Sequence, residues 1–182
     1  MVIGTIIREA ENIKKTYGED AGVFDIMHGE KIISILFSMG DDAASCKGFI
    51  LNSYGRAAIT VNSDLSEELQ KIVFYHEVAH YFLHVKPGIM ENVTDSALYD
   101  RVSETELEAN LLAAELQIAD RDVMEALSEY GDVYATAESL NVPAELLQFK
   151  LRVMRAKGIS IPEMDLGEKP TYLAEIHDRM QF

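Results

Sequence analysis

The sequence predicts an α+β domain that is mainly helical and contains a small sheet of about three strands. Apolar residues recur at helical spacing along most of the chain, as is typical of helices with one buried face. Three short runs between residues 31 and 62 are instead rich in β-branched and aromatic residues. The segments that join these runs are too short for crossover helices, so the sheet should be at least partly antiparallel.

The N-terminal third of the chain supplies two helices and the sheet. Apolar spacing predicts a first helix over residues 5–17, which stops at Gly18, and a second over residues 21–27. The runs "KIISILF", "KGFILNS" and "RAAITVN" are bounded by Gly, Asp, Asn and Ser and predict the strands.

Residues 62–85 predict a long helix on which the sheet should pack. Asn62, Ser63 or Asp64 can cap it, and the helix is apolar almost all round from residue 72, which indicates a buried central position. Further helices are expected over residues 103–118, 120–129, 133–140, 143–156 and, as a short final element, 171–181.

The composition narrows the class of protein. The chain has 182 residues, 48% of them apolar and 26% charged, as in soluble globular proteins, and no run approaches the roughly 18 apolar residues that span a bilayer. The N-terminus turns charged too soon for a secretory signal, so we expect a cytoplasmic protein. Cys46 is the single cysteine and therefore excludes both an internal disulfide and a multi-cysteine zinc site.

The net charge of −15 bears on possible partners. Affinity for nucleic acid comes mainly from Lys and Arg on phosphates, so we expect no direct nucleic-acid binding. An acidic surface favours basic partners or simply solubility. We expect one domain over residues 1–158, with a helix-turn-helix-like pair over 133–156 as scaffold, and a C-terminal extension over 159–182.

The stretch "HEVAH" at residues 76–80 matches the helical zinc motif H-E-x-x-H. His76 and His80 are four residues apart and therefore point from one helix face toward a common ion. Glu77 leaves that face but lies close enough to accept a proton from the attacking water. Two imidazoles and a carboxylate in an apolar helix are costly to bury without a partner, and a metal ion is such a partner.

The motif supplies only two ligands. His84 lies about 12 Å along a straight helix from His76, too far for one ion, and is expected outside the ligand set. A carboxylate from the next helix would complete a site of two histidines and a glutamate with one position open for water. Glu108 is the first choice because it borders the apolar side, and Glu104 is the second. Glu106 shares its side with Asn110 instead.

Three segments together resemble one known family. They are "GFILNSYGRAAITVNSDLSEELQKIVFYHEVAHYFLH", "ETELEANLLAAEL" and "AESLNVPAELLQFKLRVM", within roughly residues 5–156. The resemblance is to the ImmA/IrrE family of small cytoplasmic metallopeptidases, H-E-x-x-H zincins of the gluzincin type. It implies a zincin-like fold, a bound zinc or another divalent ion such as manganese, His76, His80 and Glu108 as ligands, and Glu77 as general base.

The resemblance also implies an activity, namely site-specific cleavage of a helix-turn-helix transcriptional repressor that relieves repression of a mobile element or stress regulon. A basic DNA-binding substrate would suit an anionic protease. Two other functions remain open. The helical pair over 133–156, with Lys150, Arg152 and Arg155, could bind DNA, although the net charge opposes this. The chain could also be a non-hydrolytic, metal-binding relative that acts as a protein-interaction module.

Overall fold

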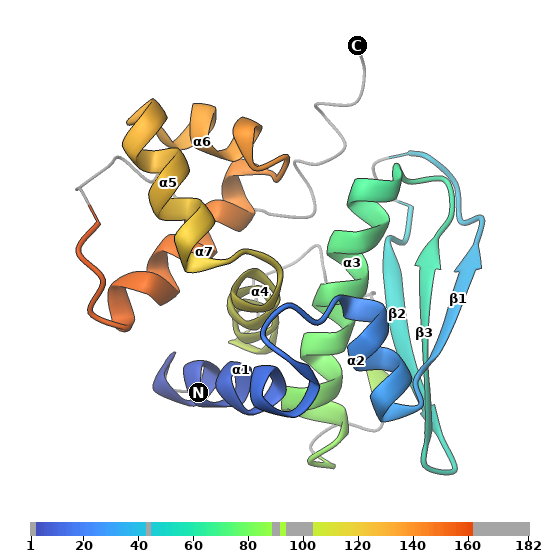
Figure 1. The fold of residues 1–182 in the computed structure, drawn as a ribbon. Coiled ribbons are helices and arrows are strands. Elements are labelled where there is room, and N and C mark those ends of the chain that lie inside the picture. The colour runs from blue at the N-terminus through green and yellow to red at the C-terminus, as the bar shows by residue number, and fades with distance from the viewer. Residues whose placement is uncertain (1–2, 43–44, 89–91, 94–103, 162–182) are drawn as a thin grey trace.

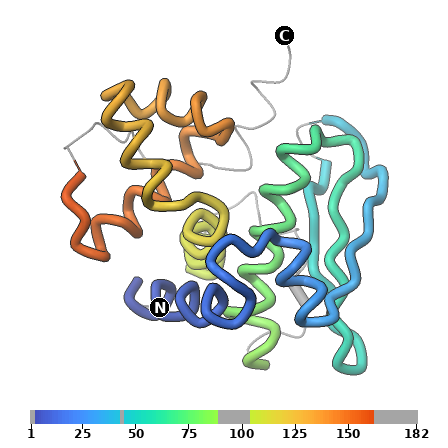
Figure 2. Tube along the Cα trace, viewed as in Figure 1, coloured from blue at the N-terminus to red at the C-terminus, as the bar shows by residue number. Residues whose placement is uncertain are grey.

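Two central helices separate a small sheet from a group of C-terminal helices (Figure 1). The structure is a computed structural model that describes residues 3–42, 45–88, 92–93 and 104–161. The tube in Figure 2 follows the chain from the two N-terminal helices through the sheet, into the central helices, and out to the C-terminal group. The mainly helical α+β class predicted from the sequence is confirmed.

The sheet has the order β1-β3-β2-β4 and is mixed. Helices α1 (Ile3–Tyr17) and α2 (Val23–Glu30) precede β1 (Ile33–Phe37), β2 (Gly48–Ser53) and β3 (Arg56–Asn62). β1 is parallel to β3, whereas β2 is antiparallel both to β3 and to β4 (Asn92–Val93). The expected, partly antiparallel sheet is therefore present, and the two-residue β4 adds an edge strand that the sequence did not predict.

Asn62, at the end of β3, hydrogen-bonds the connection between β1 and β2. Its side-chain oxygen accepts hydrogen bonds from the amides of Met39 at 3.1 Å and Asp64 at 3.0 Å. Its amide nitrogen donates to the carbonyls of Gly40 at 2.7 Å and Cys46 at 3.1 Å. The fully buried asparagine thus holds both ends of the segment that carries the chain from one edge of β3 to the other.

The predicted long helix is present in two parts. Helix α3 (Glu67–His80) begins after Ser66, whose side chain accepts a hydrogen bond from the Leu69 amide at 3.4 Å, so the predicted caps at residues 62–64 were wrong. A π-helix, η1 (Tyr81–Val85), continues it. Every residue of α3 from 72 to 80 is buried, because the sheet and α2 cover one side and a second central helix covers the other.

That second central helix is α4 (Glu104–Gln117), which packs on α3, α1 and the C-terminal helix α7 (Ala144–Ala156). In the chain, α5 (Asp120–Tyr130) and α6 (Val133–Ser139) lie between α4 and α7. The helices predicted after residue 103 are thus confirmed up to residue 156, and the one expected over 171–181 lies outside the described residues. In the described part of the chain, no helix is long and apolar enough to cross a membrane.

A buried ion network joins the helices around α4. Lys150 of α7 is fully buried, and its ammonium group lies 2.6 Å from Glu115 and 2.6 Å from Asp120. Glu115 also accepts from Lys14 of α1 at 3.0 Å and from Lys157 at 2.5 Å. This carboxylate therefore connects three helices, which fixes the position of α4 against α1 and α7.

Candidate metal centre and active site

Three side chains from the two central helices converge at one point. The Nε2 atoms of His76 and His80 lie 3.0 Å apart, and each lies 3.2 Å from a carboxylate oxygen of Glu106. Both histidines are on α3, and Glu106 is in the first turn of α4. All three are buried or nearly so, and they are a group that could hold a metal ion.

The separations between these donor atoms suit a single ion. Ligands about 2.0–2.1 Å from a tetrahedral zinc lie roughly 3.3–3.4 Å from one another. The observed separations of 3.0–3.2 Å are close to this value. Two imidazoles and one carboxylate also form the usual protein ligand set of a catalytic zinc site, so the residues present fit a divalent metal.

The protonation states of the group agree with metal binding. Burial lowers the pKa of His80 to about 4, which leaves its imidazole neutral at neutral pH. Burial alone would raise the pKa of Glu106, but the neighbouring imidazoles of His76 and His80 lower it well below its ordinary value, so this side chain is a carboxylate. Neutral imidazole and ionised carboxylate are the forms that bind metals.

Asn110 sets the orientation of the first histidine. Nδ1 of His76 donates a hydrogen bond to the side-chain oxygen of Asn110 at 2.9 Å, and both groups are buried. A proton on Nδ1 leaves the lone pair of Nε2 free to face the ion, as in other sites where a hydrogen-bond acceptor behind the histidine selects the tautomer. Glu106 and Asn110 are four residues apart, so one face of α4 supplies both.

Glu108, predicted as the third ligand, lies elsewhere. Its carboxylate lies 3.1 Å from Nε2 of His84, and the group that His76 and His80 form contains Glu106 in its place. Its apolar neighbours in the sequence favoured Glu108, whereas the face of α4 that meets the histidines of α3 carries Glu106 and Asn110. The spacing of Glu106 and Asn110 was the signal that could have identified the carboxylate. Glu104, the second choice, is exposed and outside the group.

His84 lies within the π-helix. One uniform α-helix was expected from the sequence, but the chain changes to π geometry at Tyr81. The ring of His84 lies beside that of His80, with 5.3 Å between their centroids, while Nε2 bonds to Glu108. His84 is thus a buried neighbour of the group and not a member of it, and its place outside the ligand set stays a prediction.

Glu77 lies beneath the first residue of β2. A Cβ atom added to Gly48 would lie 3.6 Å from Cγ of Glu77, 2.5 Å from Cγ1 of Val73 and 3.2 Å from the carbonyl oxygen of Thr60. The strand can approach α3 this closely only because residue 48 has no side chain. Glu77 itself is 5% exposed, and β2 packs against its side chain.

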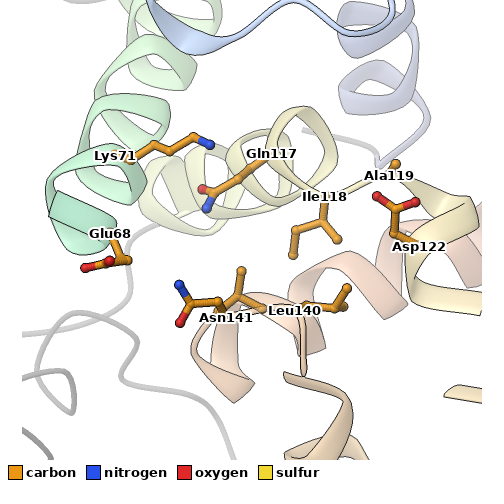
Figure 3. Close-up of a pocket in the computed structure, with 9 residues that line it drawn as sticks. Glu68, Lys71, Gln117, Ile118, Ala119, Asp122, Leu140 and Asn141 are labelled. Carbon is orange, nitrogen blue, oxygen red and sulfur yellow. The ribbon is translucent and has the colours of Figure 1, made fainter. Parts of the chain in front are cut away.

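The remaining residues considered from the sequence lie apart from the group. His28 is exposed on α2, and His177 lies outside the described residues. A hollow of about 230 Å³ is found at the opposite ends of the central helices (Figure 3). Glu68 and Lys71 of α3 line it together with Gln117 of α4. Lys71 comes about one and a half turns before His76, and Gln117 comes about three turns after Glu106. No residue of the metal group lines this hollow, so it is separate from that group.

Comparison with known proteins identifies the family. The model of the IrrE N-terminal-like domain, a peptidase family named Peptidase_M78, matches residues 33–152. The chain belongs to this family. Metallopeptidase ImmA of Bacillus subtilis (strain 168) is 27% identical over 150 residues, which cover 80% of this chain and 83% of that protein.

Family membership and geometry agree. The matched residues include the strands β1–β3, both histidines and Glu106. The protein is therefore a metallopeptidase of the ImmA/IrrE family, and it carries the two histidines and the glutamate as a metal-binding cluster. The resemblance noted from the sequence is confirmed at the level of the family.

Proposed function

We propose that the protein is a zinc-dependent endopeptidase in which His76, His80 and Glu106 hold the ion and Glu77 is the general base. The observation that carries the proposal is the convergence of two imidazole nitrogens and a carboxylate within 3.0–3.2 Å of one another, one residue from Glu77. Manganese or another divalent ion would also suit this ligand set. Glu108 then has a different part, holding the ring of His84.

Different residues of the chain have different roles in peptide-bond hydrolysis. The chemistry that a divalent ion supplies at such a site is polarisation of the scissile carbonyl and a lower pKa for the attacking water. Glu77 accepts a proton from that water as the water attacks the carbonyl carbon, and then passes the proton to the nitrogen of the leaving amine. Asn110 keeps His76 in one tautomer throughout, and β2 excludes bulk water above Glu77.

We further propose that the substrate is a helix-turn-helix transcriptional repressor, whose cleavage relieves repression of a mobile element or a stress regulon. Two lines support this: the resemblance to the ImmA/IrrE family, and the net charge of −15, which would attract a basic DNA-binding protein and speed their encounter. A repressor substrate places the reaction in the cytoplasm.

The helical pair over residues 133–156 is best explained as scaffold of a catalytic domain over residues 1–158. Lys150, one of the three basic residues that suggested DNA binding, is fully buried and paired with Glu115 and Asp120. It is therefore unable to reach a phosphate. An electrophoretic shift of duplex DNA at low salt would contradict this assignment.

Metal content tests the ligand assignment. Purified wild-type protein should hold about one divalent ion per chain by elemental analysis. Loss of a group that only hydrogen-bonds to a metal ligand typically lowers metal affinity 10- to 100-fold. Glu106→Gln should lower the affinity for zinc by more than this. The matched control is Glu108→Gln, which is equally conservative, lies two residues away and should lose no more than that. If Glu108→Gln loses the metal and Glu106→Gln retains it, the third ligand is Glu108.

Cleavage tests the activity. Repressor genes in the neighbouring reading frames supply the substrates, and the readout is the appearance of two fragments by gel and mass spectrometry. Glu77→Gln should retain the metal and lose cleavage by about 100-fold or more, the typical contribution of a general base. If this variant cleaves as fast as the wild type, Glu77 is not the base. If the metal-loaded wild type cleaves none of these repressors, the substrate assignment is wrong.

A further inference from the structure

The lining of a second cavity contains more cations than carboxylates, unlike the chain as a whole. It has a volume of about 670 Å³ and lies where the start of β1, the turn between β2 and β3, and the end of η1 meet. Three cations line it, namely Lys31, Arg56 and Lys86, against a single carboxylate, Glu30. The whole chain has the opposite ratio, with 31 acidic and 16 basic residues.

The one carboxylate is already saturated. Glu30 accepts hydrogen bonds from the ammonium of Lys86 at 2.6 Å and from the hydroxyls of Tyr17 at 2.5 Å and Tyr81 at 3.0 Å. Burial alone would raise the pKa of Glu30, but these donors lower it below its ordinary value. Glu30 therefore stays ionised, and its charge balances that of Lys86.

Two positive charges are left over. Lys31 and Arg56 are exposed, and neither has an ion pair within the described ranges of the chain. Lys31 is held at the end of α2 in the left-handed conformation, with φ of 58°, and its amide bonds back to the carbonyl of His28 at 3.1 Å. Arg56 begins β3, directly after the turn at Gly55. Both cations therefore lie at an end of a helix or strand, where they line one cavity.

We propose that this cavity binds a small molecule that carries a phosphate group and is about the size of a nucleotide. A phosphate monoester is close to a dianion at neutral pH, which matches the two unpaired cations. The guanidinium of Arg56 can donate two parallel hydrogen bonds to phosphate oxygens, and Lys31 can add a point charge. The volume falls in the range of small-molecule sites, and Ile33, Ala57 and Val85 give it an apolar wall.

This site is independent of the proposed peptidase chemistry, because none of its lining residues belongs to the metal group. It nevertheless shares the π-helix with the active-site region, since Tyr81 and Val85 line it and Tyr81 directly follows His80.

Thermal unfolding in the presence of phosphate probes tests the proposal. Inorganic phosphate, pyrophosphate and adenosine 5′-monophosphate are titrated at constant ionic strength, with adenosine as the uncharged control. Near 100-fold excess over Kd, a ligand of the native state should raise Tm by roughly 5–10 °C for a chain of this size. We expect the nucleotide to act at lower concentration than inorganic phosphate, and adenosine to have no effect.

Paired variants locate the response. Lys31→Gln/Arg56→Gln should abolish the rise in Tm, and both positions are exposed, so the fold should tolerate the change. The matched control is Lys15→Gln/Arg152→Gln, which removes two exposed cations elsewhere. It should respond as the wild type does. The proposal is overturned if the wild type does not respond to the phosphate probes, or if the rise persists in Lys31→Gln/Arg56→Gln, because phosphate would then bind elsewhere, such as at the metal.

Discussion

Replacement of Glu115 by glutamine is a demanding test of the ion network that holds α4 in place. Glu115 is 2% exposed and Lys150 is fully buried. The glutamine keeps the shape of the side chain but leaves the buried ammonium, among the described residues, with the carboxylate of Asp120 alone, at 2.6 Å. Removing one partner of a buried ion pair costs about 3–5 kcal/mol, because the remaining charge stays desolvated.

Because Asp120 remains in place, the lower end of that range applies, about 3 kcal/mol. For a chain of this size, 1 kcal/mol corresponds to roughly 2–4 °C in Tm, so Glu115→Gln should lower Tm by about 6–12 °C. The double variant Glu115→Gln/Lys150→Met should recover most of this loss, since it removes the stranded charge. Unfolding by heat or urea, followed by circular dichroism at 222 nm, measures the stability of the single and the double variant.

The acid dependence provides a second readout of the same network. Burial alone would raise the pKa of Glu115, but the ammonium groups of Lys150, Lys157 and Lys14 lower it below its ordinary value of 4.5. A carboxylate with a lowered pKa in the folded state stabilises the fold above its ordinary pKa, and this stabilisation is lost as the pH falls through the folded value. The difference in stability between wild type and Glu115→Gln should therefore be full at neutral pH and shrink below about pH 4.5.

The matched control is Asp120→Asn. Asp120 is 34% exposed, and its replacement leaves Lys150 paired with Glu115. Loss of the Asp120 carboxylate should therefore lower the free energy of unfolding by about 1 kcal/mol. If Asp120→Asn destabilises the protein more than Glu115→Gln, or if Glu115→Gln changes Tm by less than 2 °C, the network does not stabilise the fold as argued.

Two further predictions concern the active site. Asn110→Ala should lower zinc affinity by about 10- to 100-fold, measured by competition with a chromophoric chelator, because Nδ1 of His76 loses the acceptor that selects its tautomer; unchanged affinity would show that the tautomer is set by other means. Gly48→Ala should destabilise the protein by about 1–3 kcal/mol in urea unfolding, because its methyl group would lie 2.5 Å from Cγ1 of Val73; Gly4→Ala, on the first turn of α1 with open space around it, is the control and should be neutral or stabilising.

Much of the fold follows from local patterns. The periodicity of apolar residues predicted α1 through α7, and three β-branched runs predicted β1, β2 and β3. The order of strands did not follow, because it is a matter of long-range pairing, in which the buried side chain of Asn62 binds both ends of the connection between β1 and β2. The cap of α3 was also misplaced, since three of the residues before Ser66 are polar and could serve equally well in isolation.

The sequence by itself determined two of the three members of the metal group. Four residues are slightly more than one helical turn, so His76 and His80 had to share a face wherever the helix lay. The third member of the group, a carboxylate, depended on the tertiary structure. Glu104, Glu106 and Glu108 all lie within one and a half turns of α4, and only the packing of α4 against α1, α3 and α7 decides which of them faces the histidines. Tertiary structure likewise gathers Lys31, Arg56 and Lys86 around one cavity, since these residues are distant in the chain and no local spacing connects them.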